Sequence, residues 1–440
     1  MKTFVLPITF AVLCAACGNH PSNETPAEAR ADLSAAKAPP ASPVVEWNRA
    51  LLQIVRTPGA QPATMHSTRS FAILHAAIYD AVNSIDGTHA PYLVRVAAAS
   101  RHASQEAAAA AAGHAVLVAL YPSFSAQLDA QLQHSLAEVA DGARKTEGVS
   151  IGQEAADRLL ALRAGDGSAD PPIKYVFGTA PGDYQSTPPN FPSQPQLTNW
   201  SHVRPFALQI ASQFRPGPPP ALTSDAYSDA FNEIKTDGIA GSTTATADQA
   251  LTGQFWNGAI QNYWNEIAQT FSLSHHLTTA QAARLFALLD LALADSVIAF
   301  YDAKYTYNLW RPVTAIRAAD TDGNPDTVAD PNWLPLVGKT APDPSYPGAH
   351  AVISAAAARV LAASLEDEQS HFSVTSEVMP GVERSFDSLA DAAREATLSR
   401  IFAGQHFRFD LTAGARLGRE VAGVVLDGLL TPRDGRDDDR

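Results

Sequence analysis

Most of this chain repeats apolar residues at helical spacing, and almost none of it alternates as a β-strand would. Alanine-rich segments with apolar residues at i, i+3 and i+4 favour helix over strand. We expect a helix from Pro43, a long one from Thr278 toward Asn308, and others at about 67–84, 101–120, 123–141, 147–164, 223–236, 245–256, 259–272, 350–365, 384–405 and 408–430. Asp295 falls within the apolar face of the long helix, where we expect it to have a basic partner. The fold is predicted to be all-α.

A proline-rich stretch from Gly165 to Pro220 interrupts the helical pattern. Proline lacks a backbone N–H and has a fixed φ, which rules out long helices in this stretch. A loop this long inside a compact protein is usually functional or connects domains. We therefore expect two packed helical bundles joined by an ordered proline-rich loop that lines the mouth of a channel. The N-terminal lobe, with its loop, covers 43–220, and the second helical domain covers 221–430.

The overall charge limits the partners of the protein. The formal net charge of −14 over 440 residues argues against nucleic acid as a partner. It also gives no global attraction for an anionic substrate. Any anion must therefore be bound by a local positive pocket.

Residues 1–17 have the pattern of a secretory signal peptide. A basic start is followed by an apolar run that is too short for a stop-transfer helix. Leu13-Cys14-Ala15-Ala16-Cys17 resembles a bacterial lipobox, although Cys14 stands where leucine is usual; cleavage with release is the alternative. We expect an exported lipoprotein on the periplasmic face of the outer membrane, because Gly18 gives no inner-membrane retention signal. Residues 18–42 are expected to be a flexible tether and 431–440 a disordered tail.

Three segments in the last third of the chain carry residues suited to one site. They are Lys304-x6-Arg311-Pro312, Pro347-Gly348-Ala349-His350 and Ser399-Arg400-x5-His406-x3-Asp410. Two unit charges ~6 Å apart repel by roughly 3 kcal/mol at an effective dielectric of ~20. A lysine and two arginines in one pocket therefore need an anion among them. The segments predict an oxyanion site whose histidines decide its chemistry.

Each segment alone permits a plainer interpretation. Lys304 and Arg311 are two helical turns apart and can share one face of a helix that Pro312 ends, but taken alone such a pair is more typical of a solvated helix end. His350 lies at a helix start, where free N–H groups bind anions and where it could act as general acid or base; it could also be a surface cap. Asp410 can fix the tautomer of His406, unless His406 is a core histidine beside a chance aspartate.

In this order and spacing the segments resemble the signature of the acid phosphatase/vanadium haloperoxidase superfamily, also called the type 2 phosphatidic acid phosphatase superfamily. That signature is Lys-x6-Arg-Pro, Pro-Ser-Gly-His and Ser-Arg-x5-His-x3-Asp. The run from His75 to Asn83 is similar to a helix of the bacterial vanadium haloperoxidase-like group, so the resemblance covers about 45–430. Gly348-Ala349 departs from the family's Ser-Gly. The missing hydroxyl donor can cost ~1–3 kcal/mol of anion binding.

The resemblance implies vanadate as the cofactor and a defined role for each matching residue. His406 would be the metal ligand and, with His350 and Asp410, catalytic. The remaining residues would hold the cofactor: Lys304, Arg311, Gly348, Ala349 and Arg400. The implied reaction is oxidation of bromide or chloride by hydrogen peroxide to hypohalous acid, with small organic molecules as acceptors.

Two other functions remain open at this point. The first is an acid phosphatase that acts through a phosphohistidine at His406, with His350 protonating the leaving group. The second is a non-catalytic oxyanion-binding lipoprotein. The sequence does not specify the halide, although Asp343, Tyr346 and Tyr301 could contribute to halide preference, and it does not specify the oligomeric state.

Overall fold

The computed structural model describes residues 42–433, except residue 98 and residues 366–369. The predicted signal peptide, nearly all of the predicted tether, and residues 434–440 of the predicted tail lie outside the described residues. The described part contains thirteen α-helices and one two-stranded hairpin. The all-α prediction is confirmed.

The helices match the predicted ones to within a few residues. Before the proline-rich loop they are α1 (Pro43–Arg56), α2 (Thr68–Asp86), α3 (Gln105–Leu120), α4 (Ser125–Ala137) and α5 (Ala143–Arg163). After it they are α6 (Asp225–Asp237), α7 (Ala247–Phe255), α8 (Ile260–Ser274), α9 (Thr279–Tyr307), α10 (Pro312–Arg317), α11 (Ala349–Leu365), α12 (Leu389–Phe402) and α13 (Arg408–Gly428). The short helix α10 and the antiparallel hairpin of β1 (Phe372–Thr375) and β2 (Glu383–Phe386) were not predicted. These elements are too short for a periodic pattern of apolar residues to be recognised in the sequence.

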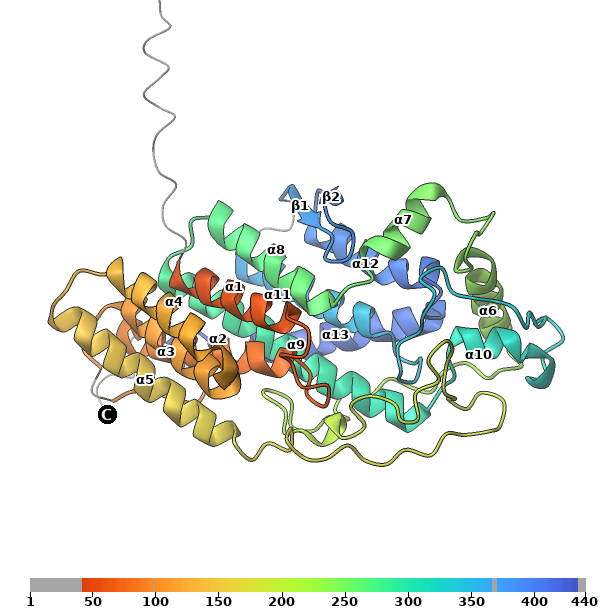
Figure 1. Cartoon of the computed structure of the whole chain (residues 1–440), viewed down its shortest axis with the longest axis horizontal. Helices are drawn as coiled ribbons and strands as arrows, with labels where there is room; N and C mark the ends of the chain where they lie inside the picture. Colours follow the sequence, from red (N-terminus) through yellow and green to blue (C-terminus); the bar gives the residue numbers. More distant parts are fainter. Residues whose placement is uncertain (1–41, 98, 366–369, 434–440) are drawn as a thin grey trace, which may run out of the picture. The chain divides into compact units, whose positions relative to one another are not determined.

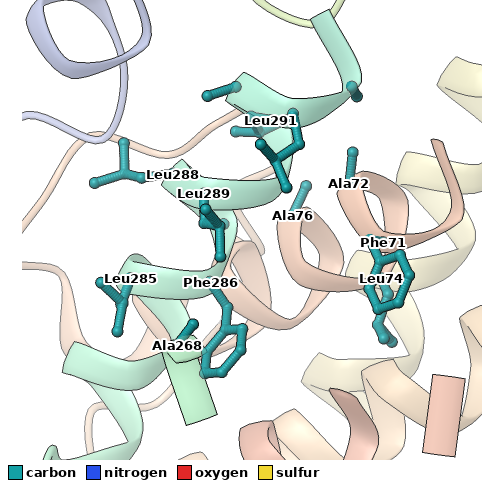
Figure 2. Packing of buried hydrophobic residues seen from close by; sticks show 14 of the residues in the cluster. Phe71, Ala72, Leu74, Ala76, Ala268, Leu285, Phe286, Leu288, Leu289 and Leu291 are labelled. Atoms are coloured by element: carbon teal, nitrogen blue, oxygen red, sulfur yellow. The ribbon is translucent and has the colours of Figure 1, made fainter. Parts of the chain in front are cut away.

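Helix α9 is the element on which both bundles pack. It starts with a capping box between Thr278 and Gln281 and ends at Asn308, which has left-handed backbone angles. α2 packs against it, and so do α11 and α13 (Figure 1). Figure 2 shows leucines of α9, among them Leu291, beside Ala72 and Ala76 of α2. The core is therefore continuous from α1 to α13, with a smaller second core around α6 and α10.

The proline-rich loop contains only one short helical turn, at Trp200–His202. Figure 1 shows it, in yellow to light green, continuing from α5 and running along α9. The Tyr184 N–H donates to the Asn308 carbonyl (2.7 Å), and the Gln196 N–H donates to the Pro342 carbonyl (2.8 Å). These bonds to segments far along the chain make the loop an ordered wrap.

Asp295 holds this wrap on α9, and the expectation of a basic partner is wrong. Its Oδ1 accepts from the Phe206 N–H (2.6 Å), and its Oδ2 accepts from the Ala207 and Leu208 N–H groups (2.7 Å each). Burial raises the pKa of Asp295 to about 6, although these three bonds favour the charged form. Three aligned N–H dipoles thus replace the expected cation.

The first residues of the predicted tail are bonded to the N-terminal bundle. The Ala90 N–H donates to the Thr431 carbonyl (2.8 Å), and the Arg433 N–H donates to the Thr88 carbonyl (3.0 Å). The prediction of disorder from 431 is therefore wrong for residues 431–433.

Across the described ranges, no single helix has both the length and the apolar composition needed to cross a membrane. The bent pair Gln105–Leu120 and Pro122–Ala137 meets this test when the two are taken together.

We expect Asp295→Ala to lower the free energy of unfolding by about 3 kcal/mol or more, because each of three buried N–H groups would lose its acceptor at roughly 1–3 kcal/mol. Urea unfolding followed by circular dichroism measures this change. Asp302→Ala is the control: it lies on the same helix but pairs with the partly exposed Arg215. An exposed pair contributes up to about 1 kcal/mol. Equal losses in the two variants would contradict the assigned role of Asp295.

Candidate active site

The three predicted segments come together where α9 ends and where α11 and α13 begin. Lys304 lies in the last turn of α9, and Arg311 directly precedes α10. The other residues lie on the C-terminal helices: Gly348, Ala349 and His350 at the start of α11, Arg400 near the end of α12, His406 just before α13, and Asp410 in its first turn. Shared hydrogen bonds and mutual charge effects connect them into one cluster.

Lys304 and Arg311 do not share a helix face, contrary to the prediction. α9 ends at Tyr307, because Asn308 adopts left-handed angles (φ 48°) that stop the helix. Pro312 begins α10 as its first residue, where its missing N–H costs nothing. The two cations are brought together by the tertiary fold around Asp343.

His406 is held in one tautomer. Its Nδ1 lies 3.0 Å from Asp410 Oδ2, and its Nε2 lies 3.1 Å from Arg311 Nη1. Since arginine can only donate, Nε2 is the acceptor and Nδ1 carries the proton. Burial and the nearby cations hold the pKa of His406 well below its ordinary value. His406 therefore presents a neutral ring with its Nε2 lone pair toward the cations.

Asp410 organises this end of the site through one oxygen. Its Oδ2 accepts from His406 Nδ1, from Ser345 Oγ (2.5 Å) and from the Phe407 N–H (3.1 Å). Burial raises the pKa of Asp410, while the Ser345 bond and the charges of Lys304 and Arg311 oppose the rise. The bond to His406 has the geometry that the spacing of the two residues predicted.

Lys304 is completely buried and fully hydrogen-bonded. Its Nζ donates to the carbonyls of Pro344 and Ser345 (3.2 Å for Ser345) and lies 3.1 Å from Asp343 Oδ1. Burial lowers the pKa of Lys304, although the Asp343 charge acts in the opposite direction. The three donors of the ammonium group are thus matched by three acceptors of the segment before α11.

Arg311 also binds that segment and reaches His406. Its Nε donates to the Asp343 carbonyl oxygen (2.7 Å), and its Nη2 donates to Asp343 Oδ1. Its Nη1 donates to the Gln405 carbonyl (3.1 Å) as well as to His406 Nε2. The anion that the cation cluster requires is therefore present within the protein, as the carboxylate of Asp343.

Arg400 is the cation with the fewest partners in the cluster. Both of its Nη atoms lie 3.4 Å from Asn257 Oδ1, and in the described part of the chain its buried Nε has no hydrogen-bond partner. Burial, together with the charge of Arg311, lowers the pKa of Arg400 to about 9. A buried guanidinium left unsatisfied in this way needs an acceptor that the described residues do not supply.

The start of α11 offers backbone N–H donors to the site. The Gly348 N–H donates to the Asp410 carbonyl (3.0 Å), so it is not available to an anion. No described residue accepts from the Ala349 N–H, which belongs to the first turn of α11. A Cβ at Gly348 would lie 2.9 Å from Leu411 Cδ2, which explains glycine at this close approach of α11 to α13.

His350 lies beside Arg400. Its Nε2 is 2.9 Å from the Trp256 carbonyl, and because a carbonyl only accepts, Nε2 carries the proton and Nδ1 has the lone pair. Burial and the Arg400 charge hold the pKa of His350 well below its ordinary value. The neutral ring can therefore accept a proton at Nδ1.

A cavity of about 420 Å³ leads to His350 and Arg400. Its walls include Pro188, Pro189 and Pro192 of the wrap, Asn257 and Gln405. The wrap therefore forms part of the wall of the cavity that reaches His350 and Arg400. A larger hollow of about 1090 Å³, between the wrap, α6 and α13, is lined by Tyr346 but by none of the predicted catalytic or cofactor-binding residues, so the smaller cavity is the one relevant to chemistry.

Sequence analysis missed four contributors to this site. Ser345 and the ion-pairing role of Asp343 could have been suspected, because both residues directly precede the Pro347–His350 segment. Asn257 and the Trp256 carbonyl come from the loop between α7 and α8, about a hundred residues away along the chain, and no motif marks them.

Comparison with known proteins agrees with this geometry. Residues 284–435 match the family described as the second helical-bundle domain of VCPO. The chain is 25% identical to the vanadium chloroperoxidase of Curvularia inaequalis, over 84% of this chain and 79% of that protein. Its fold is similar to that of a bacterial vanadium-dependent iodoperoxidase (TM-score 0.73, 24% identity, 89% of this chain and 97% of that one). It is also similar to that of a bacterial vanadium-dependent chloroperoxidase (TM-score 0.65, 17% identity, 85% and 94%). The C-terminal bundle that carries the site therefore matches the second helical-bundle domain of VCPO, and most of the chain is similar to vanadium haloperoxidases in sequence and fold.

Proposed function

We propose that the protein is a vanadate-dependent haloperoxidase that oxidises bromide or chloride with hydrogen peroxide to hypohalous acid. The observation that carries the proposal is His406, whose Nε2 lone pair is held by Asp410 to face the buried Arg311, while the charges of Lys304 and Arg400 also act on its ring. Relatives named as vanadium-dependent chloroperoxidase and iodoperoxidase support it, because they align with most of the chain.

The residues present fit a tetrahedral oxyanion such as vanadate. His406 Nε2 is the ligand that a metal centre would need, and Arg400 has a buried Nε without an acceptor. The Ala349 N–H at the start of α11 supplies a backbone donor of the kind that binds anions. Lys304 and Arg311 add charge from the inner side, where they now bind Asp343.

Vanadate bound at this site would supply a Lewis-acidic centre that activates hydrogen peroxide toward halide. Lys304, Arg311 and Arg400 would stabilise negative charge in a setting from which water is largely excluded. His350 would take a proton from entering peroxide at its Nδ1, since its lowered pKa keeps the ring neutral. Asp410 would keep His406 in the tautomer that presents Nε2.

We further propose that the protein is exported and lipid-anchored at Cys17 to the periplasmic face of the outer membrane. The lipobox-like run Leu13–Cys17 and the residue Gly18 support this proposal. A tether of about 25 residues, 18–42, would separate the anchor from the helical domain.

We expect the vanadate-loaded protein to brominate an organic dye in the presence of hydrogen peroxide and bromide, because the donor set suits vanadate. The assay compares vanadate-free and vanadate-loaded protein by dye absorbance. Hydrolysis of p-nitrophenyl phosphate without bromination would contradict the proposal and favour a phosphatase. Binding of phosphate with neither activity would favour a non-catalytic oxyanion-binding protein.

We expect His406→Ala to abolish bromination, because the site would lose its metal ligand. Vanadate binding, measured by calorimetry, should be lost with it. His371→Ala is the matched control, since His371 is an exposed histidine paired with Asp387 far from the cations. Vanadate binding equal to wild type in a folded His406→Ala variant would show that another atom holds the metal.

We expect Asp410→Asn to weaken vanadate binding by about 10–100-fold, the usual effect of losing the partner that orients a histidine ligand. The amide can no longer accept His406 Nδ1–H, the Ser345 hydroxyl and the Phe407 N–H as the carboxylate does. Nitrogen-15 NMR of the His406 ring reports the tautomer directly. Ser345→Ala removes one donor to Asp410 and leaves the histidine bond, so a loss as large as that of Asp410→Asn would argue against tautomer control.

A further inference from the structure

We propose that Asp343 is a built-in competing anion, whose carboxylate occupies Lys304 and Arg311 and must turn away before an oxyanion can bind between these cations. Asp343 would thereby lower and tune the oxyanion affinity of the site. The inference rests on the proposed function, in that it assumes an oxyanion site at His406.

The contacts of Asp343 show how completely it occupies the inner cations. Its Oδ1 lies 3.1 Å from Lys304 Nζ and accepts from Arg311 Nη2. Its Oδ2 accepts from Gln196 Nε2 of the proline-rich wrap (2.7 Å). Burial alone would raise the pKa of Asp343, but the charges of Lys304 and Arg311 outweigh burial and hold it below its ordinary value. The side chain is therefore a carboxylate bound between two cations.

Little hydrogen-bonding capacity is left on those cations while Asp343 is in place. Lys304 has its other two donors on the carbonyls of Pro344 and Ser345, and Arg311 Nη1 is shared by the Gln405 carbonyl and His406. Neither Lys304 nor Arg311 lines the cavity of about 420 Å³, whereas Arg400 does. An anion entering through this cavity meets Arg400 before the inner cations, which are already paired.

Two contacts of Asp343 would remain if its carboxylate turned away from the cations. Arg311 Nε is bonded to the main-chain carbonyl of Asp343, so that contact persists when the side chain rotates. Gln196, which already donates to Oδ2, gives the carboxylate a partner on the side of the wrap. Rotation would then expose Lys304 Nζ and Arg311 Nη2 toward His406.

In the alternative role, Asp343 only positions the two cations. The two roles predict opposite changes in oxyanion affinity when the carboxylate is removed. A competing carboxylate repels an incoming anion, since like charges ~6 Å apart cost roughly 3 kcal/mol at an effective dielectric of ~20. Its removal should strengthen oxyanion binding. A purely positioning carboxylate should weaken binding when it is removed.

The experiment is calorimetric titration of the full chain with inorganic phosphate and with orthovanadate. We expect Asp343→Asn, which keeps the shape and removes the charge, to bind both oxyanions about tenfold more tightly than wild type or better. Asp343→Ala is measured in parallel. Asp302→Asn is the control. It removes the same charge within one helical turn of Lys304 on α9, but from a carboxylate that binds Arg215. This variant should leave the oxyanion affinity unchanged.

The outcomes separate this inference from the proposed function. Wild type that binds vanadate and brominates, with folded Asp343 variants that bind no more tightly, overturns the role of Asp343 alone. If Asp343→Asn binds an oxyanion and wild type does not, the result supports Asp343 as a competing anion. The same result counts against the proposed activity of the wild-type chain. Absence of oxyanion binding in wild type and in both folded Asp343 variants overturns both proposals.

Discussion

The site depends on the compensation of three buried positive charges. Lys304, Arg311 and Arg400 are each at least nine-tenths buried, and such charges persist only if acceptors surround them. The segment before α11 supplies most of these acceptors, as the Asp343 carboxylate and as main-chain carbonyls. Arg400 is left partly unsatisfied beside the cavity. This uneven compensation leaves Arg400 as the buried cation of the cluster with hydrogen-bonding capacity beside the cavity.

The rest of the fold keeps these charges in place. α9 is buried between the two bundles and delivers Lys304 at its end, while Asp295, earlier on the same helix, ties down the wrap. The wrap in turn forms the cavity wall and places Gln196 on Asp343. The same helix, α9, therefore anchors the proline-rich loop through Asp295 and carries Lys304, one of the two cations that Asp343 binds.

The helices and the three motifs could be predicted because both are local properties. Alanine content, apolar period and capping residues act within a few residues, as the capping box at Thr278 shows. The relation of His406 to Asp410 is also local, and its predicted bond is present. The relation of Lys304 to Arg311 was mispredicted, because Asn308 ends α9 before a continuous helix could carry both residues.

The sequence by itself determined the helical class, the order of the site segments and the kinds of residue that meet there. Only the tertiary structure decided which partner each buried charge has. Asp295 binds three N–H groups, Asp343 binds two cations and Gln196, and Arg400 contacts Asn257. The physical reason is that the strength of a charge contact depends on distance and burial, and both are set by segments that lie far apart along the chain.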